Sequence, residues 1–288
     1  MESINVYQIV TERVIKALES QKQLVWRKPW QSFSEGSSLP RNLVSKNEYS
    51  GINILLLSMS GFSSPWWLSF KQVKALGGNV RKGEKGSPIV FWNFIEKEDK
   101  KTKEVKKIGF IKYYTVFNAE QCEGIETPKV GIREVSENQK IESCENVISG
   151  FKDCPKILEK EQQAYYSPKG DYINMPKKSS FESSEEYYSV LFHEMIHSCG
   201  SSTRLNRKGV SQRTYFASED YSKEELIAEL GSAFLAAITG IELKTQENSI
   251  AYIQGWIKAL RNNSKLIIEA AGAAQKSVDY ILGSKKFN

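Results

Sequence analysis

The residues best suited to chemistry are two histidines and the glutamate between them. His193 and His197 are the only histidines among 288 residues, and they lie four apart, with Glu194 after the first. Residues four apart share one face of an α-helix, so both imidazoles can bind one metal ion. A glutamate in this position can take a proton from an attacking water. The pattern predicts a zinc site for peptide hydrolysis, with His193 and His197 as ligands and Glu194 as the catalytic base; Mn²⁺ is an alternative ion.

A third protein ligand must come from elsewhere, because catalytic zinc usually has three protein ligands and one water. No histidine remains, so a carboxylate is expected. Glu225 and Glu229 lie four apart in a predicted helix. As in thermolysin-like sites, Glu225 is favoured as the ligand, with Glu229 orienting a ligand histidine through its second ring nitrogen. Ser222 and Glu225 also fit a helix capping box, in which case Glu229 would be the ligand.

Peptide hydrolysis needs two further features besides the ligands. The first is a group that stabilises the oxyanion. Its candidates are Tyr215, Tyr221, Arg204 and Arg213. The second is an edge strand along which a peptide substrate can lie, and the segment 171–175 is the expected one.

The elements expected to position this site make the second half of the chain mostly helical. Ser183 or Ser184 is a suitable N-cap for a helix that runs to Ser198, with acidic residues in its first turn. Strands are predicted at 156–166 and 171–175, around a turn at 167–170. Further helices are predicted up to Gly150, at 222–238, at 247–260 and from there to about residue 282.

The first half mixes helices and strands. Helices are predicted at 3–20 and 70–76, and the apolar run 51–59 fits a helix or a buried strand. Strands are predicted at 88–95 and 108–117, joined by a charged hairpin tip. The charged segment 124–138, which contains Pro128 and Gly131, is typical of a linker. We therefore expect an α+β protein of two domains, residues 1–126 and 139–288, with a linker at 127–138.

Positive charge and tryptophan are concentrated in the first half. The net charge is +6, and residues 1–130 hold 20 Lys and Arg against 13 Asp and Glu, so the whole excess lies there. Five of the six tryptophans lie in the same half. Cations along a groove, with aromatic faces for unpaired bases, are what binding of single-stranded nucleic acid requires.

The residues predicted to contact DNA are the cations and aromatics of this half. They are Trp26, Arg27, Lys28, Trp30, Arg41, Tyr49, Trp66, Trp67, Lys71, Arg81, Lys82, Lys85 and Trp92. For each of these tryptophans, packing in the core is the alternative. The glycine-rich run 77–86 lacks the Gly-Lys-Ser/Thr of a P-loop, so nucleotide hydrolysis is not expected.

Cysteines and hydropathy indicate the compartment. The four cysteines form no Cys-x-x-Cys pair, which favours reduced thiols. No run approaches the roughly 18 apolar residues of a membrane span, and the first 20 residues do not resemble a signal peptide. We expect a cytoplasmic protein without membrane association.

Short segments in both halves of the chain together form a familiar pattern. In the first half they are Trp26–Trp30, Arg41-Asn42, Tyr49–Asn53, Lys71-Gln72, Gly77–Gly86 and Phe117–Gly124. In the second half they are His193–His197, Arg204–Arg207, Glu224–Glu229 and Ala274–Lys276. Through these segments nearly the whole chain resembles ArdC-type antirestriction proteins of conjugative plasmids. The first half is similar to their single-stranded-DNA-binding domain, and the second half to their zincin-like (gluzincin) metallopeptidase domain.

The resemblance implies a protein that binds transferred plasmid DNA while it is single-stranded and shields it from host restriction. Double-stranded DNA is a second candidate partner, and a subunit of a restriction enzyme is a candidate protein substrate. Two alternatives stay open. One is a non-proteolytic DNA shield with a structural metal site, and the other is a protease that acts on DNA–protein crosslinks.

Overall fold

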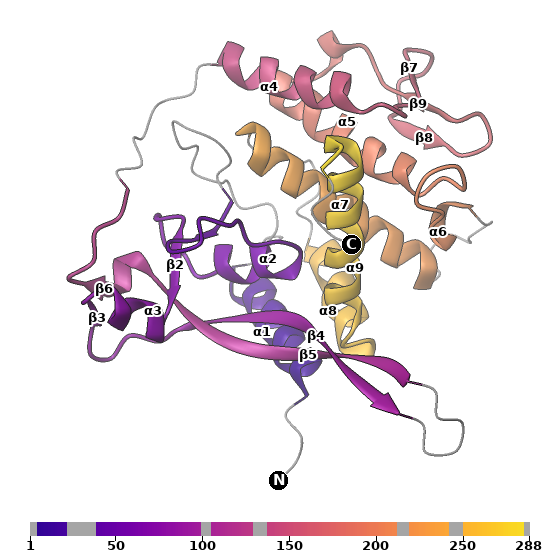
Figure 1. The fold of residues 1–288 in the computed structure, drawn as a ribbon. Helices are drawn as coiled ribbons and strands as arrows, with labels where there is room; N and C mark the ends of the chain where they lie inside the picture. Colours follow the sequence, from indigo (N-terminus) through magenta and orange to yellow (C-terminus); the bar gives the residue numbers. More distant parts are fainter. Residues whose placement is uncertain are drawn as a thin grey trace.

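The computed structural model describes residues 5–21, 39–98, 105–128, 137–211, 219–241 and 250–284 (Figure 1). Helices and strands are mixed, as the expected α+β class requires. In these ranges no helix is long and apolar enough to cross a membrane.

A four-stranded sheet organises the first half. Its order is β1 (Arg41–Asn42), β2 (Trp66–Ser69), β5 (Val105–Asn118), β4 (Ser87–Glu98). β1 runs parallel to β2, and the other pairs are antiparallel. The two predicted strands therefore form the expected hairpin, and both are longer than predicted. β3 (Asn79–Val80) and β6 (Cys122–Glu123) form a separate antiparallel pair. The short helix η2 (Ala119–Gln121) directly precedes β6.

Two short helices accompany this sheet. The apolar run at 51–59, for which the sequence allowed either a helix or a buried strand, forms the helix α2 (Ile52–Ser58). α3 (Phe70–Ala75) lies at the predicted place and begins with a capping box between Ser69 and Gln72. α2 packs against β4 and also against α9 (Leu266–Leu282), near the end of the chain.

The predicted N-terminal helix, α1 (Val6–Gln21), connects the two halves. It packs against α8 (Ile250–Asn262) and α9. The Thr11 hydroxyl donates to the Ser264 carbonyl at 2.7 Å. Val10, Val14 and Leu18 are fully buried in the same hydrophobic cluster as α5, α7 and α9. One core therefore runs through both halves, and the boundaries at 126 and 139 stay a prediction.

The second half begins with α4 (Glu137–Gly150) and a three-stranded sheet of order β7-β9-β8. The strands are β7 (Lys156–Leu158), β8 (Tyr165–Ser167) and β9 (Tyr172–Asn174). Two expectations were wrong. The segment 156–166 is two short strands, because the Asn174 side chain accepts from the amides of Lys160 and Glu161 and holds a loop there. β9 is not an edge strand, since it pairs with β7 on one side and β8 on the other.

The remaining helices form the main layer of this half. They are α5 (Ser184–Cys199), α6 (Lys208–Ser211), α7 (Glu219–Thr239), α8 and α9, with the short helix η3 (Lys178–Ser180) before α5. The Ser183 hydroxyl caps α5 by accepting from the Glu186 amide at 3.2 Å. α5 and α7 approach closely at Gly231, where a Cβ would lie 2.7 Å from the Ile196 side chain. This contact sets the spacing of the two helices that carry the predicted ligands.

Candidate metal site and nucleic-acid interface

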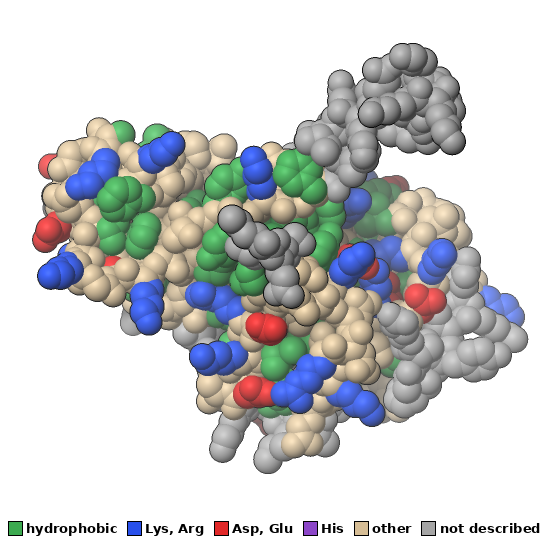
Figure 2. Space-filling model, turned by 90° about the horizontal axis from the view of Figure 1, so that it is seen from below, with side chains coloured by type: hydrophobic (Ala, Val, Ile, Leu, Met, Phe, Trp, Pro, Cys, Tyr) green, Lys and Arg blue, Asp and Glu red, His purple; other side chains and the backbone are tan. Residues whose placement is uncertain are grey.

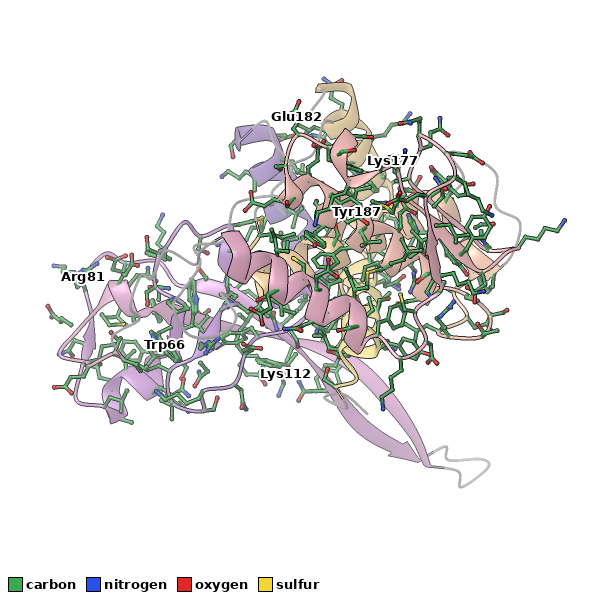
Figure 3. All side chains as sticks on the ribbon, turned by 90° about the horizontal axis from the view of Figure 1, so that it is seen from above. Trp66, Arg81, Lys112, Lys177, Glu182 and Tyr187 are labelled. Carbon is green, nitrogen blue, oxygen red and sulfur yellow. The ribbon has the colours of Figure 1, made fainter. Side chains whose placement is uncertain are left out.

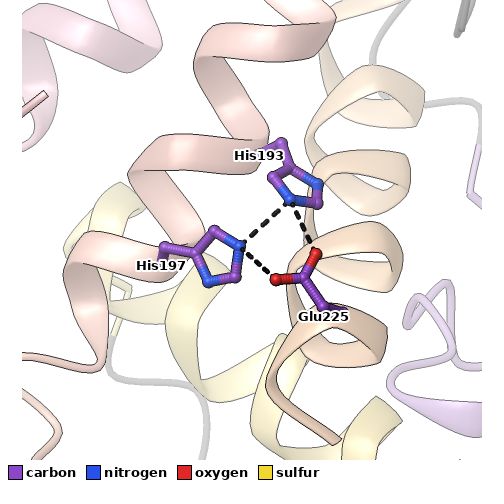
Figure 4. Close-up of side chains that lie close together, drawn as sticks. All are labelled: His193, His197 and Glu225. Carbon is purple, nitrogen blue, oxygen red and sulfur yellow. Dashed lines mark hydrogen bonds and ion pairs between the residues drawn. The ribbon is translucent and has the colours of Figure 1, made fainter. Parts of the chain in front are cut away.

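Three predicted ligands meet between α5 and α7 (Figure 4). The Nε2 atoms of His193 and His197 are 3.0 Å apart. Each nitrogen lies 3.6 Å from a carboxylate oxygen of Glu225. Ser222 lies inside α7, so the capping-box alternative for Glu225 does not apply.

The spacing of these donor atoms fits a divalent ion. Two donors about 2.1 Å from one ion in tetrahedral geometry lie about 3.4 Å apart, and the observed separations are 3.0 and 3.6 Å. Burial alone raises the pKa of Glu225, but the two histidines outweigh it and lower this pKa, so the carboxylate is charged. Two imidazoles and one carboxylate are a donor set that zinc and Mn²⁺ accept.

Glu224 is a partner of the site that the sequence did not indicate. Its Oε1 lies 3.3 Å from Nδ1 of His197. Arg207 binds the same carboxylate with two nitrogens, at 2.6 and 2.9 Å. The Arg207 guanidinium also donates to the Ile196 carbonyl at 2.6 Å and to the Ser277 hydroxyl at 2.7 Å. Glu224 fixes the tautomer of His197 with Nε2 toward Glu225, and Arg207 fixes Glu224.

The electrostatics of this pair follow from burial and charge. Burial lowers the pKa of His197, but Glu224, Glu194 and Glu225 outweigh it and raise this pKa to about 9 in the metal-free protein. Burial raises the pKa of Glu224, but hydrogen bonds from Arg207 and His197 outweigh it and lower this pKa. The predicted orienting residue, Glu229, is buried one turn further along α7. Its assignment stays a prediction.

The predicted catalytic base lies beside this cluster. Glu194 is 9% exposed, and its Oε2 accepts a 2.8 Å hydrogen bond from the Tyr166 amide of β8. Its charge acts on both His197 and Tyr221. β8, which holds Tyr166, is an edge strand of its sheet among the described residues, so the edge strand that contacts the glutamate is β8 and not the predicted segment 171–175.

The four candidates for oxyanion stabilisation have different positions. The Tyr221 hydroxyl hydrogen-bonds Glu225, which places it at the cluster. Arg204 binds both Asp171 oxygens, at 2.8 and 2.9 Å, and its side chain is 4% exposed, so its guanidinium is already paired. Arg213 and Tyr215 lie outside the described residues.

The cysteines take no part in the cluster. All four are free thiols, and Cys144 and Cys199 are fully buried. Burial is the main cause that raises the pKa of each of these two thiols to about 12.

Several aromatics predicted to stack on bases lie in the core instead. Trp67 is 2% exposed, Trp66 7% and Tyr49 8%. Trp67 packs edge-on against Phe62. Figure 3 places Trp66 within the first half, where Lys46 lies 4.8 Å from its ring centre. These rings present no free face to a base, so their role is packing in the core.

The predicted cations lie nearer the surface. Lys71, Arg81, Lys82 and Lys85 are exposed. Arg81 forms a 2.8 Å ion pair with Glu84 at the outer end of the first half (Figure 3). The residues Trp26, Arg27, Lys28 and Trp30 lie outside the described residues.

Trp92 and Arg41 lie at a cleft. Trp92 is 56% exposed on β4, beside Phe91 at 45%. The cleft has a volume of about 1070 Å³ and lies between the first half and α9. Arg41 lines it and forms a 3.0 Å ion pair with Glu48.

Two solved structures are similar to this chain over nearly its whole length. The metal-free crystal structure of the antirestriction protein ArdC from the R388 plasmid superposes with a TM-score of 0.79 at 37% identity, over 98% of both chains. The chain belongs to the ArdC antirestriction family. The Mn(II)-bound structure of the same R388 protein gives a TM-score of 0.77 at 34% identity, over 99% of this chain and all of that one.

The family models divide the chain as the ArdC resemblance predicts. Residues 4–117 match the N-terminal domain of anti-restriction factor ArdC, and residues 146–273 match a zincin-like metallopeptidase. The resemblance and the two-domain α+β class are confirmed.

Curated relatives include longer proteins. Two Escherichia coli proteins named DNA primase TraC are 32% and 33% identical over 96% and 95% of this chain. The chain spans only 20% and 26% of their lengths. An uncharacterized protein, y4eC, from Sinorhizobium fredii (strain NBRC 101917 / NGR234) is 32% identical over 96% of this chain and 91% of its own.

Proposed function

We propose that this chain is an antirestriction protein that binds single-stranded DNA and hydrolyses protein at a zinc or Mn²⁺ site, thereby protecting transferred DNA. The observation that carries the proposal is the meeting of His193, His197 and Glu225 beside the buried Glu194. Membership of the ArdC antirestriction family supports the protective role. The metal ligands proposed are His193, His197 and Glu225, and the site residue proposed as base is Glu194.

The chain's own groups provide the remaining parts of a hydrolytic site. A bound divalent ion would polarise a carbonyl and lower the pKa of a water. The Tyr166 amide holds the Glu194 carboxylate, which would accept the proton of the attacking water and pass it to the leaving amine. Tyr221, which reaches Glu225, is the remaining described candidate for stabilising the oxyanion.

Exposed cations and aromatics support the DNA-binding part of the proposal. On the face seen from below, Lys and Arg side chains surround hydrophobic patches (Figure 2). Phe91, Trp92, Tyr113 and Tyr114 are each more than 40% exposed on the β4–β5 hairpin. Exposed rings among cations suit unpaired bases and a phosphate backbone.

The change Glu194→Gln tests the peptidase. It removes the proton acceptor but keeps the shape and the ligands, so metal content should stay near wild type while hydrolysis falls about 10²- to 10⁴-fold. The measurement compares protein fragments and transfer of restricted single-stranded DNA in cells carrying the wild type or the variant. Glu182→Gln, in an exposed position before α5, is the matched control.

The outcome separates the proposal from its alternatives. Fragments that depend on Glu194, together with lost protection, support a protective peptidase. Full protection by Glu194→Gln with normal metal content would instead favour a DNA shield with a structural metal. Fragments that derive only from proteins crosslinked to DNA would favour the crosslink protease.

A further inference from the structure

A cleft lies where the two halves meet. Its volume of about 1070 Å³ slightly exceeds the roughly 300–1,000 Å³ of small-molecule pockets, so it can hold a short stretch of a polymer chain. The first half contributes residues 41–42 and 45–53, Gln72 and Val90–Trp92. The second half contributes Ile268, Gly272, Gln275, Lys276 and Asp279, all on α9.

Amide side chains fix the wall from the first half. Asn53 on α2 donates to the Val90 carbonyl and accepts from the Val90 amide, both at 2.8 Å. This clamp holds β4 where Phe91 and Trp92 emerge. Asn42 and Gln72 exchange two hydrogen bonds, at 3.1 and 3.2 Å. These hydrogen bonds hold the wall in place without a ligand, which lowers the entropy cost of binding.

α9 forms the opposite wall and is tied to the first. The Gln275 side chain accepts from the Gly51 amide at 3.0 Å and donates to Asp279 at 2.9 Å. Gly51 has φ +56°, which favours glycine and turns its amide toward α9. Lys276, next to Gln275, is exposed and forms no ion pair within the described ranges.

The charges and rings of the cleft match an unpaired nucleic-acid strand. Of its acids, Glu48 is paired with Arg41 and Asp279 accepts from Gln275. Lys46 on one wall and Lys276 on the other are both exposed, and the Lys46 ammonium lies 4.8 Å from the centre of the Trp66 ring. Phe91 and Trp92, on β4, also line the cleft and are exposed. Phosphates would meet the lysines and bases would meet the rings.

We propose that single-stranded DNA binds in this cleft, with Trp92 stacking on a base and Lys46 and Lys276 contacting phosphates from the two walls. The DNA site is then composite, because α9 of the metallopeptidase-like half supplies part of it. This inference rests on the proposed DNA-binding function and gives it a location.

Fluorescence anisotropy of the full chain with a labelled oligothymidylate tests the location. Trp92→Ala should weaken binding about tenfold, because one stacked base contributes roughly 1–3 kcal/mol and 1.4 kcal/mol is tenfold. Lys276→Ala should lower the slope of log affinity against log salt by about 0.7, the value for one phosphate contact on a single strand. Phe70→Ala and Lys177→Ala are matched controls, since both residues are exposed but do not line the cleft.

A second measurement uses only the wild type, so it does not depend on whether the variants fold. The wild type is photocrosslinked to an oligothymidylate that carries 5-iodouridine, and the crosslinked peptides are identified. Adducts on the peptide with Phe91 and Trp92 and on the peptide with Lys276 support the composite site.

The outcomes distinguish the cleft from DNA binding in general. Wild-type binding that is unchanged by Trp92→Ala and Lys276→Ala, or crosslinks confined to other peptides, overturns the location and leaves DNA binding intact. Absence of wild-type binding overturns the proposed DNA-binding function and the cleft with it.

Discussion

The metal-ligand cluster and the cleft are built in different ways. The cluster takes its ligands from two packed helices, and two of the three ligands lie one helical turn apart. The cleft takes its lining from segments between residues 41 and 279, and side-chain amides hold its walls together. A site that a short motif nearly completes can be found in sequence, whereas a site assembled from distant segments cannot. The comparison also predicts that damage to one region should spare the other.

The largest expected effect concerns the third ligand. Glu225→Gln should lower metal affinity by more than about 100-fold, because it removes a charged ligand, a larger loss than the 10–100-fold typical of outer partners. Glu229→Gln is the matched variant, one turn away on α7. Metal content after dialysis and titration calorimetry measure the effect. If Glu229→Gln loses the metal and Glu225→Gln keeps it, the ligand assignment is reversed.

A smaller effect on the metal is expected from the residue that holds Glu224. Arg207→Ala should lower metal affinity about 10–100-fold, because His197 loses its oriented partner. It should also lower the free energy of unfolding by about 3–5 kcal/mol, because the buried Glu224 carboxylate loses its ion pair. Urea denaturation and metal titration measure the two effects.

A double variant separates the two effects of Arg207. Arg207→Ala with Glu224→Gln should recover part of the stability, because no buried charge is left unpaired, but not the metal affinity. Wild-type metal affinity in Arg207→Ala would show that this hydrogen-bonded chain does not support the site.

The smallest effect should lie in the cleft. Asn53→Ala leaves the Val90 amide and carbonyl without their side-chain partner, so the free energy of unfolding should fall by about 2–4 kcal/mol. DNA affinity should fall with it, because the clamp on β4 is lost, while metal content should not change. Asn53→Asp, which keeps the acceptor for the Val90 amide but sets a buried carboxylate oxygen against the Val90 carbonyl, should lose at least as much stability as Asn53→Ala. A change in metal content would show that the two regions are coupled.

The aromatic half shows where sequence alone misleads. Tryptophan is both a stacking platform and a core residue, and neither spacing nor neighbouring charge distinguishes these roles. Trp66 and Trp67 are adjacent in sequence and both buried, because they pack in two different hydrophobic clusters. Trp92, on β4, belongs to neither of these clusters and is 56% exposed.

Local rules were sufficient for much of the second half. The Ser183 cap, the extent of α5 and the shared face of His193 and His197 depend on positions within a few residues, so the sequence determined them. Because the chain has only two histidines, a carboxylate was the expected third ligand. The split of the segment 156–166 escaped prediction, because Asn174 reaches back over more than ten residues to hold the loop.

Other features depended on contacts between distant segments, and only the tertiary structure decided them. Glu225 joins the histidines because Gly231 lets α5 and α7 approach, and Glu224 is fixed by Arg207 from another loop. Gln275 fastens Gly51 across the boundary between the halves, so the cleft exists only in the folded chain. Helix periodicity acts over a few residues and is visible in sequence, whereas the packing and hydrogen bonds that join the halves form only when the common core is buried.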